Sequence, residues 1–271
     1  MEKYELKNIQ LGEVKLRVNN MYQSLDFYKK VLGLKVLELG RGSVKLTADG
    51  VKSLIEIEEI PKAIIPEPQS RIGLYHVALL LPTRKDLGLL FKNLMKLNVP
   101  FEQADHLVSE AIYISDPDNN GIEISYDRPR ECWKYDENNE VVMATDFLAV
   151  EDVLAEVGED SFIGLSTETV IGHLHLHVGN LEIHLLEHSV KVKGKSLDLT
   201  LKEFRLLSIL AQEPGKVWSK FKLLDLVWQI NLELESNVVE ATIRNVRRKM
   251  EALGSTAKIE SKRHLGYWLE A

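Results

Sequence analysis

The clearest apolar pattern lies near the C-terminal end of the chain. Val239, Ile243, Val246 and Met250 recur at the i, i+4, i+7 and i+11 spacing of one helical face. The pattern predicts an amphipathic helix over residues 236–251, with its polar side turned outward.

Two shorter helices and a hairpin are predicted around this helix. Thr200 and Glu203 have the spacing of a capping box, and a Pro-Gly pair ends the helix that begins there. A second helix begins at Ser219. After the third helix, residues 257–269 alternate around a basic turn, 262–264, which predicts a β-hairpin. Three helices followed by a hairpin predict a winged helix-turn-helix.

The N-terminal part reads as two similar halves within residues 9–126. Each half starts with an alternating strand, continues with a helix that has one apolar face and ends with three more strands. We therefore expect an α+β protein, with paired βαβββ modules that form a curved mixed sheet ahead of the winged helix. The expected strands are 14–18, 34–39, 43–48, 53–58, 76–81, 100–106, 110–114 and 121–126, and the second helix is 84–97.

A third start follows these two halves. Residues 172–180 repeat the pattern of residues 12–20 position for position, with His173, His175 and His177 at alternate places. Alternate residues of a strand point the same way but sit roughly 6–7 Å apart. We therefore expect surface histidines that do not converge on one ion without help.

Composition excludes several classes of protein. The chain has 271 residues, 45% of them apolar, which fits two soluble domains, and its single cysteine, Cys132, excludes an internal disulfide. No apolar run approaches the roughly 20 residues of a membrane span. Without a signal-peptide pattern at the N-terminus, the expected location is the cytoplasm, with no membrane partner.

The net charge of −7 conceals an uneven distribution. Residues 181–271 contain 15 basic and 12 acidic residues, so the remainder carries −10. Seven basic and two acidic residues lie between Ala241 and Arg263. Clustered cations gain by releasing counterions from a DNA duplex, and arginine and asparagine on a helix can read bases in the major groove. The sequence therefore predicts binding to double-stranded DNA.

The segments LTLKEFRLLSILAQEPGKVWSKFKLLDLVW, SNVVEATIRNVRRKM and IESKRHLGYWL resemble the OmpR/PhoB-type effector domain of bacterial response regulators. The resemblance covers about residues 182–271. It implies a recognition helix at 236–251, with Arg247 near phosphate, and a wing at 257–269, from which Arg263 reaches the minor groove. His264 replaces the usual glycine of the wing turn. The candidate DNA-binding residues are Asn237, Ala241, Arg244, Asn245, Arg247, Arg248, Lys262 and Arg263.

The segments SLDFYKKVLGL, LYHVALLLP and SEAIYISDPDNNGIEISYDRPRECW resemble the vicinal oxygen chelate superfamily of glyoxalases, bleomycin-resistance proteins and extradiol dioxygenases. The resemblance covers about residues 8–180 and is closest to catechol-2,3-dioxygenase-type members, with the second module cut after one strand. It implies His173 as the first extradiol ligand. It also implies a second candidate site for a divalent Fe, Mn, Ni or Zn ion. That second ligand set is Glu13, Glu56, His76 and Glu123.

The predicted domains are residues 1–180 and 181–271, and no phosphorylated receiver pattern precedes the effector. We expect a bacterial transcription regulator whose N-terminal domain senses a small molecule or mediates homodimerisation, with no catalytic residues assigned. The alternative is a metal-dependent glyoxalase-like lyase or extradiol-dioxygenase-like enzyme fused to a DNA-binding domain. An uncoupled chimera is the third possibility.

Overall fold

A computed structural model describes residues 11–63, 65, 73–137, 141–185, 187–229, 237–262 and 265–271. The chain divides into two compact units, and the division falls inside strands β5 (Gly73–Leu80) and β9 (Val170–Val178). Unit 1 comprises Met1–Pro66 and Val77–Gly172, and unit 2 comprises Glu67–His76 and His173–Ala271. Among the described helices, none has the length and apolar character needed to cross a membrane.

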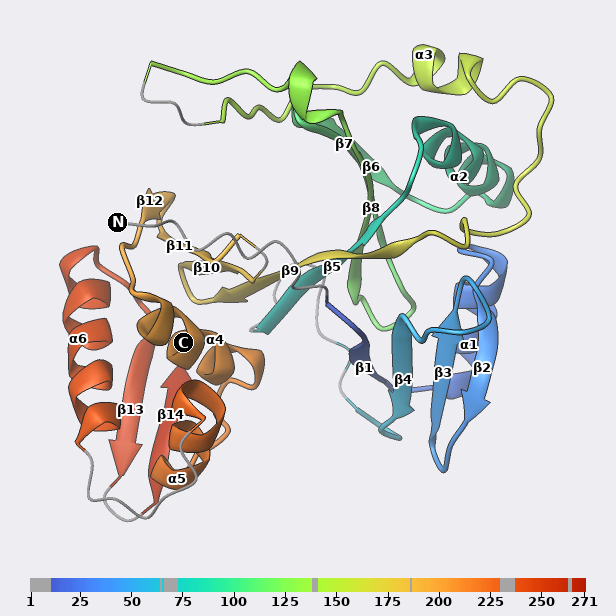
Figure 1. The fold of residues 1–271 in the computed structure, drawn as a ribbon. Coiled ribbons are helices and arrows are strands. Elements are labelled where there is room, and N and C mark those ends of the chain that lie inside the picture. The colour runs from blue at the N-terminus through green and yellow to red at the C-terminus, as the bar shows by residue number, and fades with distance from the viewer. Residues whose placement is uncertain are drawn as a thin grey trace. The chain divides into compact units, whose positions relative to one another are not determined.

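The first half of unit 1 is a βαβββ module. Its strands are ordered β1-β4-β3-β2, with β1 parallel to β4 and the other pairs antiparallel (Figure 1). Val14, Leu16 and Val18 are buried on one face of β1, as the alternation predicted. The elements are β1 (Val14–Val18), α1 (Met21–Lys30), β2 (Lys35–Leu39), β3 (Ser43–Thr47) and β4 (Ile55–Glu59).

Gly33 closes the turn after α1. Its φ of +66° lies in the left-handed region, and a Cβ there would come within 2.2 Å of the Gly164 Cα atom in the same unit. Any larger residue at position 33 would therefore meet both backbone strain and a backbone clash.

The second half of unit 1 repeats the βαβββ order, which confirms the expected paired modules. Its strands are ordered β5-β8-β7-β6, and α2 is capped by the Thr83 side chain at its start and by Asn98 in the left-handed conformation at its end. A short helix, α3 (Val150–Ala155), follows later. The elements are β5 (Gly73–Leu80), α2 (Arg84–Leu97), β6 (Glu102–Asp105), β7 (Ser109–Ser115) and β8 (Gly121–Asp127).

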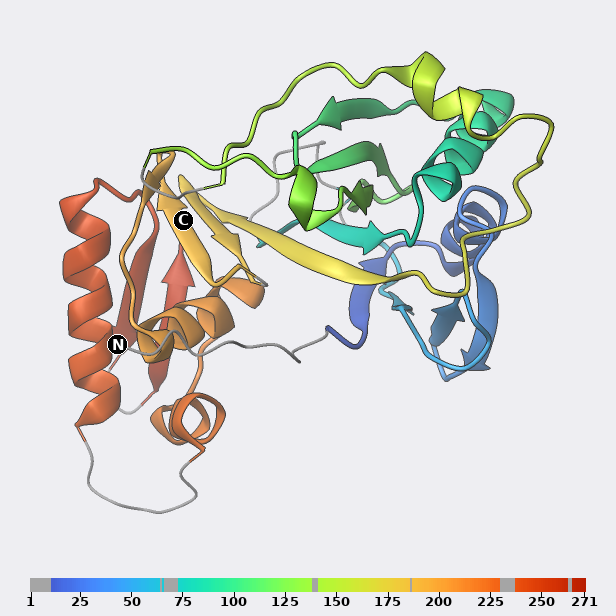
Figure 2. The ribbon, with the colours of Figure 1, turned by 45° about the horizontal axis from the view of Figure 1, so that its top comes forward.

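Unit 2 is a winged helix preceded by a small antiparallel sheet, β9-β10-β11-β12 (Figure 2). Three helical segments follow, the second of which continues into a π-helical turn at Leu224–Trp228. The last two strands form the predicted wing hairpin. The elements are β9 (Val170–Val178), β10 (Leu181–His184), β11 (Ser189–Val192), β12 (Lys195–Ser196), α4 (Leu201–Gln212), α5 (Lys220–Leu223), α6 (Val238–Ala252), β13 (Lys258–Lys262) and β14 (Gly266–Glu270).

Strand β9, which repeats the pattern of β1, also contributes to the core of unit 2. Its Leu176 and Val178 belong to the apolar core of the winged helix, together with Ile183 of β10 and the buried face of α6. The segment read as the start of a second dioxygenase module therefore serves unit 2 as part of the small sheet. The predicted domain border at residues 180 and 181 stays a prediction.

Candidate functional site

Helix α6 presents one apolar and one basic face. Val239, Ile243, Val246 and Met250 are all buried in the core of unit 2, as the sequence predicted. Glu240 lies in the first turn and Lys249 in the last, which suits the helix dipole. Because the apolar stripe is buried, only the side chains on the other face of α6 are accessible to a binding partner.

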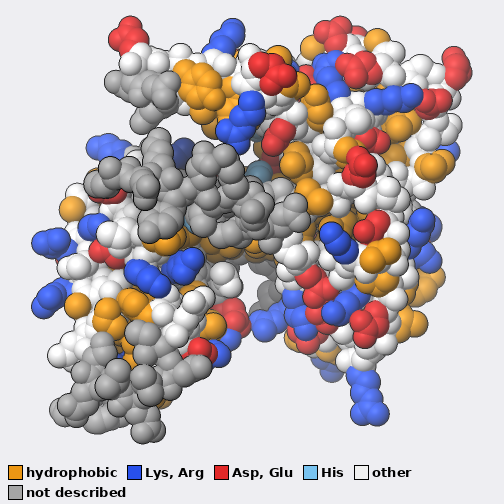
Figure 3. All heavy atoms as spheres, viewed as in Figure 1, with side chains coloured by type: hydrophobic (Ala, Val, Ile, Leu, Met, Phe, Trp, Pro, Cys, Tyr) orange, Lys and Arg blue, Asp and Glu red, His pale blue; other side chains and the backbone are white. Residues whose placement is uncertain are grey.

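Two arginines on the outer face have no hydrogen-bond or salt-bridge partner among the described residues. Arg244 and Arg248 are exposed, lie one turn apart, and make no hydrogen bond or salt bridge with another residue in the described part of the chain. Asn245 and Ala241 are half-buried beside them. Figure 3 shows several separate Lys and Arg side chains on the side of unit 2 where Figure 1 draws α6. An exposed basic helix with a core-anchored back is suited to a nucleic-acid groove.

Two other cations of α6 are engaged within unit 2. The Arg247 Nε donates a hydrogen bond to the Ile259 carbonyl at 2.7 Å, and a second guanidinium nitrogen donates to Ser261 Oγ at 3.1 Å. These bonds tie α6 to β13 of the wing. The sequence placed Arg247 near phosphate, and that role stays a prediction beside this structural one.

Lys249 is held by the first helix of the domain. Its Nζ lies 2.8 Å from a carboxylate oxygen of Glu203, and the same oxygen accepts the Thr200 backbone N–H at 2.8 Å. Burial raises the pKa of Glu203, but the hydrogen bonds from Lys249 and Thr200 outweigh it and leave the pKa below its ordinary value. The predicted capping box of Thr200 and Glu203 is thus present, and Lys249 binds its glutamate.

The remaining predicted DNA-binding residues lie at the edges of this surface. Asn237 is exposed directly before α6, and Lys262 is exposed at the end of β13. Arg263 and His264 lie outside the described residues. Lys262 is therefore the predicted wing residue that the structure describes.

The carboxylates of the first module do not fit a metal site. Glu56 Oε1 lies 3.1 Å from Lys15 Nζ, and Glu13 Oε2 lies 3.6 Å from Lys45 Nζ. Burial raises the pKa of Glu56, but hydrogen bonds from Lys15 and Ser43 lower it further than burial raises it. Ammonium groups thus stand where a cation would bind. Within the described part of unit 1, no cluster of three potential ligands includes Glu13 or Glu56.

The other predicted ligands belong to different units of the chain. Glu123 is buried on β8 of unit 1, opposite Tyr113 of β7. In unit 2, His76 Nε2 and His173 Nε2 lie 3.1 Å apart, with their rings at 66°. Two imidazole nitrogens at this separation could serve as neighbouring ligands of a divalent ion. The pair is the part of the predicted ligand set that the structure brings together within one unit.

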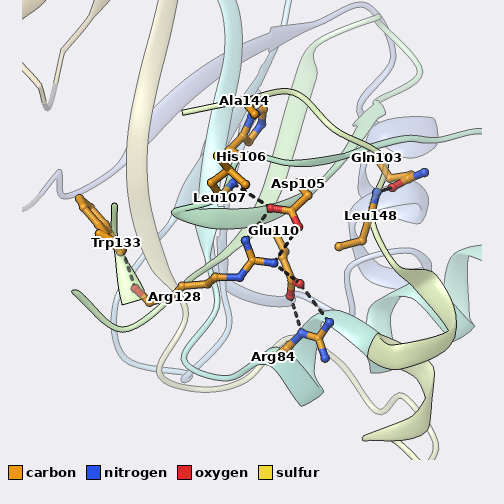
Figure 4. Close-up of polar contacts among 10 residues, drawn as sticks. All are labelled: Arg84, Gln103, Asp105, His106, Leu107, Glu110, Arg128, Trp133, Ala144 and Leu148. Carbon is orange, nitrogen blue, oxygen red and sulfur yellow. Dashed lines mark hydrogen bonds and ion pairs between the residues drawn. The ribbon is translucent and has the colours of Figure 1, made fainter. Parts of the chain in front are cut away.

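Unit 1 contains a charge network that the sequence did not predict. Glu110 of β7 is 1% exposed and binds two arginines, Arg84 at 2.5 Å and Arg128 at 2.7 Å (Figure 4). Arg128 also makes a paired contact with Asp105 at 2.5 and 2.8 Å, and Arg84 binds Glu156 at 2.6 Å. The network joins the start of α2 to β6, β7 and the end of β8. No spacing in the sequence signals it, because its members come from separate elements.

The chain joins a paired βαβββ region to a winged helix whose last helix, α6, has an exposed face with two arginines. Residues 194–269 match the family "Transcriptional regulatory protein, C terminal", and residues 10–124 match the "Glyoxalase/Bleomycin resistance protein/Dioxygenase superfamily". The C-terminal region is therefore an OmpR/PhoB-type effector domain, and the N-terminal region is a glyoxalase/dioxygenase superfamily domain. Both predicted resemblances are confirmed.

The chain is similar to different proteins in its two parts. It is 42% identical over 172 residues to a catechol-2,3-dioxygenase of Bacillus subtilis (strain 168), which covers 64% of this chain and 60% of that protein. It is 34% identical over 135 residues to the transcriptional regulatory protein PrrA of Mycobacterium tuberculosis, which covers 46% of this chain and 55% of that protein. The chain thus spans little more than half the length of each relative.

Solved structures also resemble one part at a time. The DNA-binding domain of CpxR from E. coli is 28% identical, with a TM-score of 0.32, and covers 36% of this chain and 96% of that chain. A glyoxylase/bleomycin resistance protein/dioxygenase domain from Frankia sp. EAN1pec is 24% identical, with a TM-score of 0.40, and covers 45% of this chain and 99% of that chain.

Proposed function

We propose that this protein is a transcription regulator that binds double-stranded DNA through α6. The observation that carries the proposal is the pair of exposed arginines, Arg244 and Arg248, on a helix whose opposite face is buried. The match of residues 194–269 to the C-terminal family of transcriptional regulatory proteins supports it.

We further propose that the glyoxalase/dioxygenase-like region regulates the effector domain by binding a small molecule or by forming a homodimer. It lies ahead of the effector in the chain, where the sequence shows no receiver pattern. If this region regulates the effector, a ligand that binds it changes the DNA affinity of the full chain, and DNA changes the ligand affinity by the same factor. Analytical ultracentrifugation of the free and DNA-bound protein tests the proposed homodimer, because it measures the mass of the sedimenting species.

The test of DNA reading starts from selection of duplexes out of a random pool by the full chain. In a competition titration against single-base changes of the selected site, Asn245→Ala is expected to alter the preference, because a lost amide–adenine pair costs about 1–3 kcal/mol at one base. Lys262→Ala is the wing control. It is expected to weaken all sequences by a similar factor, because phosphate contacts carry little base identity.

Two results would contradict this assignment. An unchanged preference profile for Asn245→Ala would place the reading residues elsewhere on α6. Failure of the full chain to retain any duplex at low salt would refute the proposed function itself.

A second candidate function is a metal-dependent enzyme of the glyoxalase or extradiol dioxygenase type. Two observations favour it: the identity to a catechol-2,3-dioxygenase and the His76–His173 pair. A bound divalent ion would supply Lewis-acid or oxygen chemistry, and His173 and His76 would contribute two of its ligands. Turnover of catechol by the iron-loaded chain, lost in His173→Ala, would establish this alternative.

A further inference from the structure

The outer face of the small sheet in unit 2 carries a cluster of histidines. Leu176 and Val178 of β9 point into the winged-helix core, so the alternate residues, His175 and His177, lie on the opposite face. The antiparallel register places Glu182 of β10 opposite His177 and His184 opposite His175. Four potential ligand side chains therefore share one face of two neighbouring strands.

The ring nitrogens converge more closely than the strand spacing suggested. His175 Nε2 and His177 Nε2 lie 3.0 Å apart, and the ligand atoms of His175, His177 and Glu182 all lie within 4.8 Å of one another. The nitrogens lie closer together than the strand positions because strand rise sets the spacing of the backbone and the long side chains bend toward each other. Two nitrogens bound to one ion at about 2.0–2.1 Å would be separated by roughly 3.0–3.4 Å.

The third group has no competing partner. Glu182 is half-buried and makes no hydrogen bond or salt bridge with another residue of the described segments. Its carboxylate would complete a set of two nitrogens and one oxygen, with a fourth position left for His184 or solvent. This donor set suits ions that accept imidazole and carboxylate together.

The rings of Tyr75 and His184 pack against the cluster. The Tyr75 ring stacks on the His177 ring, with the two centroids 4.2 Å apart and the planes at 16°. The ring centroids of His184 and His175 lie 3.9 Å apart. Burial, with smaller contributions from the neighbouring histidines, lowers the pKa of His175 to about 2, and burial also lowers the pKa of His177 and of His184. The proposed site rests on the geometry of these side chains, and metal binding uses the neutral form of imidazole.

We propose that His175, His177 and Glu182 form a binding site for a divalent transition-metal ion of the Co²⁺, Ni²⁺, Cu²⁺ or Zn²⁺ class, on the outer face of the effector domain's small sheet. The site uses neither His76 nor His173. It does not depend on the proposed regulatory function, since metal binding is measured without DNA.

The test is titration of the full chain, without a polyhistidine tag, with Co²⁺ followed by visible d–d absorption. Wild-type protein is expected to bind one ion at this site. His175→Gln, His177→Gln and Glu182→Gln are each expected to weaken that binding by at least about tenfold, since loss of even an outer-shell partner costs about 10–100-fold. His188→Gln, a histidine of the same unit outside the cluster, is the matched control and is expected to bind Co²⁺ normally.

A second measurement needs no variant. Bound Co²⁺ is expected to shift the ring-proton resonances of His175 and His177 far outside the normal range. Because their strand also forms the domain core, Co²⁺ is expected to raise the thermal midpoint of unit 2 in a concentration-dependent way.

Three results would overturn the inference. One is binding that persists in the His175→Gln/His177→Gln double variant and is lost in His173→Gln, which would assign the ion to the His76–His173 pair. Another is paramagnetic shifts confined to that pair. The third is the absence of saturable Co²⁺ binding by the wild-type chain.

Discussion

The two exposed arginines of α6 allow a sharp test of how this protein meets DNA. Arg244 and Arg248 have no intramolecular partner among the described residues, whereas Lys249 is bound to Glu203. Replacing both arginines by alanine should therefore remove DNA contacts and leave the fold intact. Exposed positions of this kind usually change the free energy of unfolding by no more than about 0.5 kcal/mol.

The magnitude follows from counterion release. If each arginine neutralises one phosphate, the double variant lowers the log–log slope of affinity against salt by about 1.8, from about 0.9 per contact. Between about 50 and about 200 mM salt, the double variant should then lose roughly twelvefold less affinity than the wild type. Fluorescence anisotropy with a labelled duplex, at four or more salt concentrations, measures the slope directly.

Two controls separate charge, base reading and folding. Arg244→Lys keeps the charge but not the forked geometry that reads guanine, so the slope should stay, and a relaxed base preference would show that Arg244 contacts a base as well as a phosphate. Lys249→Gln should keep the slope but lower the free energy of unfolding by about 1–3 kcal/mol, because the buried Glu203 carboxylate loses its charged partner. An unchanged slope in the arginine double variant would refute the assignment of α6 as the DNA-contacting helix.

Three further predictions concern stability and catalysis. Glu110→Gln should lower the free energy of unfolding of unit 1 by about 3 kcal/mol in urea titrations, because two partly buried arginines lose their shared anion; an unchanged midpoint would show that the network adds nothing. Because the pKa of Glu203 is lowered in the folded state, its contribution to stability is present above the ordinary value of 4.5 and is lost as the pH falls through the folded pKa. Thermal midpoints of Glu203→Gln should thus depend less on pH in that acid range than wild-type midpoints, and parallel curves would contradict the assignment. Purified protein supplied with Fe(II) should consume no oxygen with catechol above the buffer rate, since the dioxygenase likeness covers 60% of that relative; clear turnover would favour the enzyme.

The sequence alone determined the elements and the two resemblances. The apolar stripe of α6, the capping box at Thr200 and Glu203, and the paired βαβββ order were all readable, because periodicity and capping depend on residues within a few positions of each other. The predicted boundaries differ from the structure by one or two residues at most of the elements. The predicted roles of the DNA-facing side chains remain predictions.

Tertiary structure decided which charged groups are free. Arg247 bonds to β13, 12 and 14 residues along the chain, and Lys249 bonds to Glu203, 46 residues away. Local pattern shows four neighbouring cations on one helix and cannot tell these two from Arg244 and Arg248. The partner comes from another element, and only packing brings it near.

For the histidines of β9, the sequence predicted the shared face but not the distances between the side chains. Their alternation was visible, and it correctly placed His175 and His177 on one face. The convergence of their nitrogens and the approach of Glu182 depend on rotamers and on the register with β10. Neither is encoded within a few residues of sequence, because side-chain conformation is chosen by the neighbours that pack around it.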